Sequence, residues 1–251
     1  MVSFRSHLAA IAGPGLNLNL QGGLRLRERL RLRFLLTFVV AHSGLILAVE
    51  TNTVVDGWLK AQTNLQTWQA DFIQTRTFKT LVHPLMATGH VWFASPNRFR
   101  WELGSPTQTI ALRRSDDMIV VYPMLKRAER YPLTGKDTGE WRDVLALLEA
   151  GFPGSRTELD ERFRIESLTE TNAAWQLVLQ PTSASARKMI KRIHVGLATN
   201  NFSLTSTELV FADDSRMRND FTNAKPNPSV DDDLFDWKPD SDFKVIEPLA
   251  K

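Results

Sequence analysis

The stretch Met86–Leu103, MATGHVWFASPNRFRWEL, decides how the rest of the chain is interpreted. Two apolar-rich runs flank Ser95-Pro96-Asn97, which favours a tight turn because Pro fixes φ and Asn tolerates turn geometry. After the turn, apolar and charged residues alternate, as on a β-strand. The apolar set is Phe99, Trp101 and Leu103, and the charged set is Arg98, Arg100 and Glu102. The pattern predicts a β-hairpin with one aromatic face and one charged face.

Two interpretations of the aromatic face are open. In the first, the hairpin packs on an ordinary hydrophobic core, since patterning alone mostly reports burial. In the second, the sheet wraps around an apolar ligand. The chain has seven Trp and 14 Phe, and such side chains fill cores but also line sites for apolar ligands.

The composition fits one sizeable domain preceded by a leader. The 251 residues include no Cys, which excludes a disulfide framework, a thiol nucleophile and a thiolate metal site. Residues 1–48 hold six Arg and one acid, which leaves 25 basic and 27 acidic residues in 49–251, a net charge of −2. Because the region after the leader is near neutral, the formal charge of +3 does not indicate nucleic-acid binding.

The basic run 25–33, RLRERLRLR, precedes a 15-residue and mostly apolar run from Phe34 to Ala48. This order is typical of a secretory signal peptide, and the apolar run is short for a bilayer span. We expect residues 1–48 to be a leader that is removed after Ala48, with cleavage after Ser43 as the second choice. The alternative is a membrane anchor that stays attached.

After the leader, the pattern predicts a helix from Asn52 and then a series of ten to twelve strands. We expect strands near 68–78, 86–94, 98–103, 107–113, 117–122, 126–131, 163–168, 174–180, 189–197, 204–212 and 215–224, and a last short one at 243–246. The clearest helical spacing runs from Trp141 to Phe152, and Asp231 to Asp233 precede one short helical turn. Because helices do not alternate with strands, we expect an α+β fold with one large antiparallel sheet and helices on one face.

Residue patterns that carry catalysis or metal binding do not occur in recognisable form. His83, His90 and His194 are far apart in sequence, and no Gly-x-Ser-x-Gly or phosphate-binding glycine loop occurs. The paired acids lie in predicted turns, where carboxylates usually cap or face solvent. We therefore expect that the protein is not an enzyme and that it binds no metal and no cofactor.

The apolar pattern instead predicts a ligand cavity. We expect a floor of Phe99, Trp101, Ile119 and Val121 on the sheet, and a roof of Leu145 and Leu148 from the 141–152 helix. We assign further apolar residues to the same cavity: Val91, Phe93, Leu177 and Leu179. Such a groove has the character that acyl chains require.

Two motifs carry a resemblance to a known family. Gly89-His90-Val91-Trp92-Phe93 followed by Pro96-Asn97-Arg98-Phe99-Arg100-Trp101 resembles the central motif of the LolA family of periplasmic lipoprotein carriers, and Trp68-Gln69-Ala70-Asp71-Phe72-Ile73-Gln74 resembles that family's first strand. The resemblance covers roughly residues 50–248. It implies an open, incomplete β-barrel over residues 49–251, a single curved antiparallel sheet whose concave apolar face is lidded by helices.

The resemblance also implies a function. It implies a periplasmic protein that holds the acyl chains of a lipoprotein, receives it from an inner-membrane ABC transporter and passes it to an outer-membrane acceptor; we expect a monomer. Some family members carry an Arg before the Pro that holds the lid closed, where this chain has Ser95. Arg98 and Arg100 match another form of the motif and are the candidate lid contacts.

Two other functions remain open. The first is a carrier for another acylated lipid or a polyene. The second is a lipid-sensing regulatory module built on the same sheet.

Overall fold

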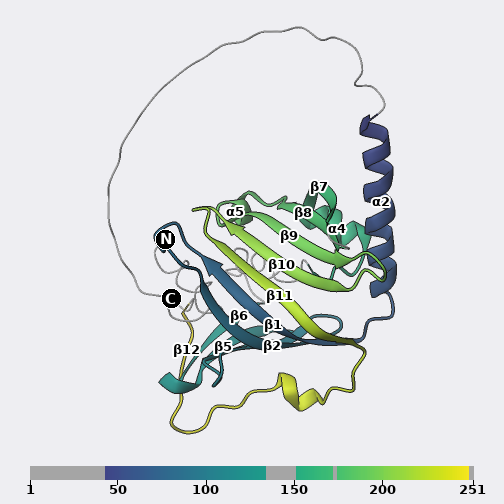
Figure 1. Cartoon of the computed structure of the whole chain (residues 1–251). Helices are drawn as coiled ribbons and strands as arrows, with labels where there is room; N and C mark the ends of the chain where they lie inside the picture. The colour runs from purple at the N-terminus through teal and green to yellow at the C-terminus, as the bar shows by residue number, and fades with distance from the viewer. Residues whose placement is uncertain (1–42, 134–150, 172–173, 249–251) are drawn as a thin grey trace, which may run out of the picture.

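The computed structural model describes residues 43–133, 151–171 and 174–248. It is an α+β fold built on one open 12-stranded sheet in the order β12-β6-β5-β4-β3-β2-β1-β11-β10-β9-β8-β7 (Figure 1). The expected single large antiparallel sheet is therefore confirmed. The strands of the first half are β1 Thr67–Thr77, β2 Leu85–Ala94, β3 Arg98–Leu103, β4 Thr109–Arg113, β5 Asp117–Tyr122 and β6 Arg127–Pro132.

The second half forms another run of neighbouring strands. These are β7 Phe163–Thr171, β8 Ala174–Pro181, β9 Ile190–Ala198, β10 Leu204–Phe211 and β11 Arg216–Pro226. β1 pairs with β11 and joins the two runs into one sheet. The last strand, β12 Lys244–Ile246, pairs with β6 in parallel, so the sheet is not antiparallel throughout.

The described helices are few and mostly short. They are α2 Ser43–Gln62, α4 Arg156–Arg162, α5 Ala184–Arg187 and the 3₁₀ turns η1 Pro123–Leu125 and η2 Asp232–Phe235. The expected helix after Asn52 is confirmed, and it begins earlier, at Ser43. The expected turn after Asp231 is also confirmed: the Asp231 carboxylate accepts from the Asp233 N–H at 3.1 Å and caps η2. The predicted 141–152 helix lies largely outside the described residues.

The predicted hairpin is confirmed as β2 and β3. Their register pairs Phe93 with Phe99 and Val91 with Trp101. Directly paired residues of an antiparallel ladder share one face of the sheet. Gly89 lies where backbones approach closely, because a Cβ there would be 2.2 Å from Phe72 Cζ and 2.3 Å from the Glu102 carbonyl oxygen.

One face of the sheet, called here the inner face, carries the main core. This core draws buried side chains from β1, β2, β3 and from β7 to β11, together with Val55 and Trp58 of α2. Trp58 is 1% exposed, so α2 is firmly seated against one end of the inner face. The seating follows from sequence, because Val54, Val55 and Trp58 lie on one side of the helix.

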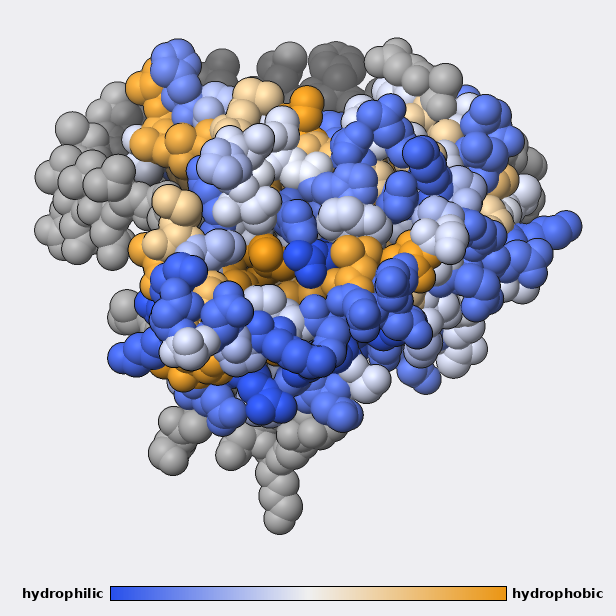
Figure 2. Space-filling view, turned by 90° about the horizontal axis from the view of Figure 1, so that it is seen from below, coloured by the Kyte–Doolittle hydropathy of each residue, from blue (hydrophilic) through white to orange (hydrophobic). Residues whose placement is uncertain are grey.

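The opposite, outer face is crossed by the C-terminal segment, residues 227–248. Its Trp237 and Phe243 pack on Leu112, Ile119 and Val121 of the sheet. Seen from below, on the side where this segment runs in Figure 1, the surface is mostly hydrophilic, with hydrophobic atoms gathered in a hollow across the middle (Figure 2). The C-terminal segment thus covers apolar side chains of β4 and β5 on the outer face.

Candidate functional site: an apolar cavity on the inner face

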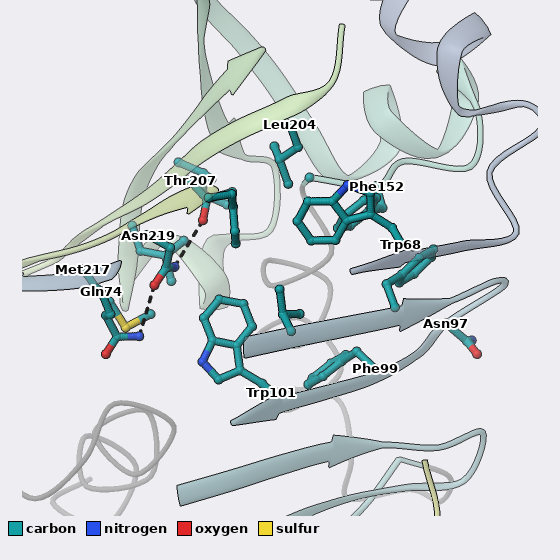
Figure 3. A pocket seen from close by; sticks show the side chains of 16 residues that line it. Trp68, Gln74, Asn97, Phe99, Trp101, Phe152, Leu204, Thr207, Met217 and Asn219 are labelled. Carbon is teal, nitrogen blue, oxygen red and sulfur yellow. Dashed lines mark hydrogen bonds between the residues drawn. The ribbon is translucent and has the colours of Figure 1, made fainter. Parts of the chain in front are cut away.

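The inner face carries a narrow, partly open apolar cavity with about 80 Å³ of space for the centre of a water molecule. Most residues that line it come from strands that lie side by side in the sheet, and Asn97, Gly151 and Phe152 come from turns and loops. Figure 3 shows the lining side chains converging on one space. The described lining consists of Trp68, Gln74, Val91, Phe93, Asn97, Phe99, Trp101, Gly151, Phe152, Ile193, Leu204, Thr207, Leu209, Met217, Asn219 and Phe221. None of these residues has an ionisable side chain, so the cavity suits an apolar ligand.

Strand register places the aromatic residues in rows across the sheet. Trp68 pairs with Phe93 and Phe93 with Phe99, so three successive strands present these rings on the inner face. Val91 and Trp101 form the next row. The alternation in the sequence thus becomes an aromatic wall once the strands are paired.

The rings contact one another closely. Phe152 is stacked on Phe93 with centroids 4.6 Å apart and an interplanar angle of 6°, and its edge meets Trp68 at 5.1 Å. Trp101 lies 4.1 Å from Phe72, which is buried in the main core. Phe152 is therefore held between two aromatic residues of the cavity wall, where an incoming chain would have to compete with it.

A line of polar side chains interrupts the apolar wall. Gln74 Nε2 donates to Asn219 Oδ1 at 3.1 Å, and Asn219 Nδ2 donates to Thr207 Oγ1 at 3.2 Å. The three residues are direct neighbours on β1, β11 and β10 (Figure 3). We call this set the polar ladder. Gln74 is 1% and Asn219 4% exposed, so the ladder lies deep in the cavity.

Four of the predicted cavity residues line the cavity: Val91, Phe93, Phe99 and Trp101. Leu177 and Leu179 also face inward, but both are fully buried in the main core and do not line the cavity. The sheet is thus solidly packed near β8, and the cavity lies near β1, β2, β3, β10 and β11. Leu145 and Leu148 lie outside the described residues, so their predicted roof stays a prediction.

The placement of Ile119 and Val121 in the cavity was wrong. Both belong to the outer cluster under Trp237 and Phe243. Ala111, which pairs with Trp101, pairs on its other side with Val120, so Val120 and not its neighbours faces inward. All residues of β5 except the last are buried, because the C-terminal segment covers the outer face of this strand. Both faces of β5 therefore carry apolar residues, and its sequence shows no alternation.

The expected lid contacts of Arg98 and Arg100 also need correction. Both side chains lie on the outer face, as alternation from Phe99 requires, and both contact η2. Arg98 Nη1 is 2.8 Å from Asp232 Oδ1, and its guanidinium lies over the Phe235 ring at 4.9 Å. Arg100 donates to the Leu234 carbonyl. Among the described residues, these arginines fasten the C-terminal segment, on the face opposite the cavity.

Several lining residues are not expected from the sequence. The sequence predicts Trp68 in a strand but does not assign it to the cavity. Its position four residues before Phe72 could have shown that both side chains lie on the same face of that strand. Leu209, Met217 and Phe221 belong to the distant strands β10 and β11, and only their pairing with each other and with β1 brings them to the cavity. Gln74 and Asn219 have no apolar signal at all.

Two arginines with shifted pKa values lie on the inner face beside the cavity: Arg76 pairs with Met217, and Arg113 pairs with Phe99. Burial lowers the pKa of both guanidinium groups.

Burial alone would raise the pKa of Asp117, but hydrogen bonds from Arg114 and Arg130 lower it below its usual value. Burial, with a hydrogen bond to Glu129, raises the pKa of the Tyr131 hydroxyl. Among the described residues no group of three or more His, Asp or Glu side chains is arranged to hold a metal ion. Within that same part of the chain, no helix has the length and hydropathy to cross a membrane.

Comparison with known proteins gives one family. The family model described as "Outer membrane lipoprotein carrier protein LolA" matches residues 63–238. The chain is also 27% identical over 212 residues to the outer-membrane lipoprotein carrier protein of Coxiella burnetii strain RSA 331, which covers 84% of this chain and 93% of that protein.

Two solved structures that match this chain do so with low scores. An uncharacterised conserved protein from Thermus thermophilus matches with a TM-score of 0.47 and 11% identity over 79% of this chain and 99% of its own. A LolA superfamily protein from Nitrosomonas europaea matches with a TM-score of 0.40 and 9% identity over 74% of this chain and 97% of its own. At these TM-scores the likeness is partial, and the family assignment rests on the sequence matches.

Proposed function

The chain belongs to the LolA family of outer membrane lipoprotein carrier proteins, and on that premise we propose that it carries lipoproteins across the periplasm with their acyl chains in the inner-face cavity. The observation that supports this most is the aromatic cavity itself. Its described lining is without ionisable groups and is continuous with the main core. Burying an acyl chain there gains about 0.8 kcal/mol per CH₂ as an upper guide.

Transport requires partners that load and unload the carrier. We propose an inner-membrane ABC transporter as donor and an outer-membrane acceptor as recipient, with the protein acting as a monomer. A carrier of this kind performs no chemistry on its cargo, which agrees with the uncharged lining. We further propose that residues 1–48 are a signal peptide removed on export and that residues 49–251 form the half-barrel carrier.

Export is tested by N-terminal sequencing of protein from its native host. The mature chain should begin near Val49 or Gly44. A mature chain that still contains Phe34 would contradict cleavage and favour a retained anchor.

Binding is tested with purified, delipidated protein. A hydrophobic dye should bind with saturable stoichiometry and be displaced by a triacylated peptide. Leu209→Phe fills part of the cavity and should weaken the binding of both the dye and the peptide. Val210→Ile is a similarly small enlargement at the adjacent outer-face position and should leave both affinities unchanged. A folded protein without saturable binding would contradict the proposal.

Mass spectrometry of lipids that co-purify with the protein separates the related functions. Acylated peptides support the lipoprotein carrier. A free lipid or polyene would instead identify a carrier for that lipid. Binding of acyl chains without transfer to acceptor membranes would point to a lipid-sensing module on the same fold.

A further inference from the structure

The connection between β1 and β2 carries a group of exposed apolar side chains. We call residues 78–86 the β1–β2 tip. Of the eight large hydrophobic side chains that are exposed among the described residues, four lie in this tip: Leu81 at 44%, Val82 at 92%, Leu85 at 44% and Met86 at 66%. Single exposed apolar residues are normal on a protein surface, but a contiguous group marks a site of interaction.

The packing of the chain does not account for these side chains. Leu85 and Met86 are successive residues of β2 and so point to opposite faces of the sheet, yet both are exposed. A strand that is apolar only because it packs on a core shows this character on one face. The turn before β2 also has Leu81 and Val82, where Gly, Asn, Asp or Ser are usual. The tip therefore presents apolar groups to the surroundings on both sides.

The strand register makes the tip project from the sheet. β3 ends opposite Gly89, so residues 85–88 of β2 lie beyond the last pair with that strand. At about 3.3 Å per residue, the hairpin extends roughly 13 Å past the end of β3. On its other side, β11 pairs with β1 only as far as Thr77. The β1–β2 and β10–β11 turns lie side by side at the end of the sheet away from α2 (Figure 1).

Basic side chains surround the base of the tip. Lys79 and Lys191 both pair with the Asp214 carboxylate, which ties the tip to the β10–β11 turn. The Ala212 N–H donates to the Met189 carbonyl at 2.8 Å, so the turn after β8 lies at the same end of the sheet. These three turns and the start of β9 hold four basic and two acidic residues: Lys79, Arg187, Lys188 and Lys191 against Asp213 and Asp214. A basic surround with an apolar projection favours an anionic membrane surface.

A second apolar point lies along the same edge of the sheet. It is η1, in which Met124 is 76% and Leu125 68% exposed. Register through β4 and β3 brings Val121 of β5 level with His90 of β2, and η1 begins two residues later. It therefore lies about level with the start of β2. Two separated apolar points fix the orientation of a protein on a surface, whereas one point leaves it free to rotate.

We propose that this end of the sheet binds a membrane, with the β1–β2 tip and η1 inserted among the lipid headgroups and the basic side chains on the phosphates of anionic phospholipids. Insertion is shallow, because the backbone of an irregular turn has no hydrogen-bond partners in hydrocarbon. This inference goes beyond the carrier function and does not depend on what the cavity holds.

The shape of the surface favours a bilayer over a protein partner. A specific protein interface buries about 800 Å² on each partner and involves about 20–30 residues of each. The tip is a narrow hairpin end with four exposed apolar side chains, and η1 adds two. A bilayer needs no matching surface, because each apolar side chain that enters it contributes to binding by itself.

Vesicle binding tests the surface without any cargo. The protein, in the form that its native host produces, is sedimented with vesicles of phosphatidylcholine that contain about one third phosphatidylglycerol, and with vesicles of phosphatidylcholine alone. Binding should be stronger on the anionic vesicles and should weaken as the salt concentration rises. Leu81→Gln combined with Val82→Gln should weaken binding about tenfold or more. Ile73→Gln is the matched control, because Ile73 is 40% exposed on the outer face within β1, and it should leave binding unchanged.

A fluorescent label locates the contact. Because the chain has no Cys, a single introduced Cys can be labelled at one chosen position. An environment-sensitive dye on Val82→Cys or on Met124→Cys should become brighter and shift to the blue on anionic vesicles. The same dye on Ile73→Cys should change little.

Several results would overturn the inference. They are no vesicle binding by the wild type, equal binding to both kinds of vesicle, binding that survives the double substitution, or a dye on Ile73→Cys that responds as strongly as one on Val82→Cys. A protein that cross-links to the tip in cells, without any vesicle binding in vitro, would assign the tip to a protein partner instead. Because no cargo is present in these experiments, each of these results leaves the carrier proposal untouched.

Discussion

Arg100 Nη1 donates to the main-chain carbonyl of Leu234 at 3.0 Å, and so joins β3 to the C-terminal segment across 134 residues of sequence. The same guanidinium pairs with Glu102 at 2.6 Å, and the two side chains are only 17% and 24% exposed. The contact lies on the outer face, directly behind the aromatic wall of the cavity. It connects the stability of the C-terminal segment to the hairpin without contacting the cavity.

Replacement of Arg100 by Leu should therefore affect stability and not ligand binding. The variant loses a charge-assisted hydrogen bond and leaves Glu102 without its partner, which should lower the free energy of unfolding by about 1–3 kcal/mol. Urea denaturation measures the loss, and dye binding to the folded variant should match the wild type. Lys238→Ala is the control, because its contact with Asp236 is 3.8 Å long and its side chain is 89% exposed. A normal denaturation midpoint with altered lipid transfer would return Arg100 to the lid role.

The ionised carboxylate of Asp117 should stabilise the folded protein at neutral pH, and this stabilisation should be lost in acid. Its carboxylate is 3% exposed at the residue level and is held by Arg114 and Arg130 at 2.9 Å and 2.7 Å. Although burial acts in the opposite direction, these bonds lower its pKa in the folded state. A lowered pKa contributes stability above the unfolded value, about 4, and that contribution is lost as pH falls through the folded value.

Asp117→Asn should thus be less stable than the wild type by about 1–3 kcal/mol at pH 7, and the difference should shrink as pH falls below about 4. Denaturation curves at a series of pH values test this. Asp116→Asn, at the exposed neighbouring position, should show no such difference. A deficit that stays constant down to about pH 2, well below the unfolded value, would mean that the charge of Asp117 is not the cause.

Gly89 is predicted to be irreplaceable for steric reasons. An added Cβ would overlap both the Phe72 ring and the Glu102 carbonyl oxygen, and the latter belongs to the paired strand and cannot move alone. Gly89→Ala should lower the free energy of unfolding by about 1–3 kcal/mol or more. Gly154→Ala is the matched control, because the nearest atom there is the flexible end of Glu158 at 2.8 Å. Equal effects of the two substitutions in denaturation experiments would contradict the steric account.

The hairpin could be predicted because one of its faces is charged. In β3 the alternation of Phe99 and Trp101 with Arg98 and Arg100 fixes which side is apolar from the sequence alone. β5 lacks this contrast, since Met118, Ile119, Val120 and Val121 are all buried. Only its register with β4, together with the cover supplied by Trp237 and Phe243, separates the inner pair from the outer pair.

The polar ladder could not be predicted from local patterns, for a different reason. Gln74 and Asn219 are 145 residues apart, and each alone is an ordinary polar residue of a strand. Their significance arises from the pairing of β1 with β11, the contact that joins the two halves of the sheet. Sequence periodicity reports which face a residue takes, but it contains no information on the partner strand.

Phe152 is the residue whose removal should distinguish a ready-made cavity from one that must open. Its ring is stacked on Phe93 and meets the edge of Trp68, so it fills space at the aromatic wall that an acyl chain would otherwise take. A ligand that enters between Phe93 and Trp68 must first break these aromatic contacts, which contribute about 0.5–1.5 kcal/mol each beyond simple burial.

Phe152→Ala should therefore lower the stability of the empty protein by about 1–3 kcal/mol, less than the usual loss for a fully buried Phe because the ring is only partly buried. The same substitution should increase the affinity for a palmitoylated peptide, because the displacement cost is absent and the cavity is larger. Phe211→Ala is the control: Phe211 is a partly buried ring packed against the main core that does not line the cavity. It should lose stability without gaining affinity. Calorimetric titration of the wild type and the two variants with the palmitoylated peptide measures these affinities. Weaker binding by Phe152→Ala would mean that Phe152 contacts the ligand and that the cavity is already open.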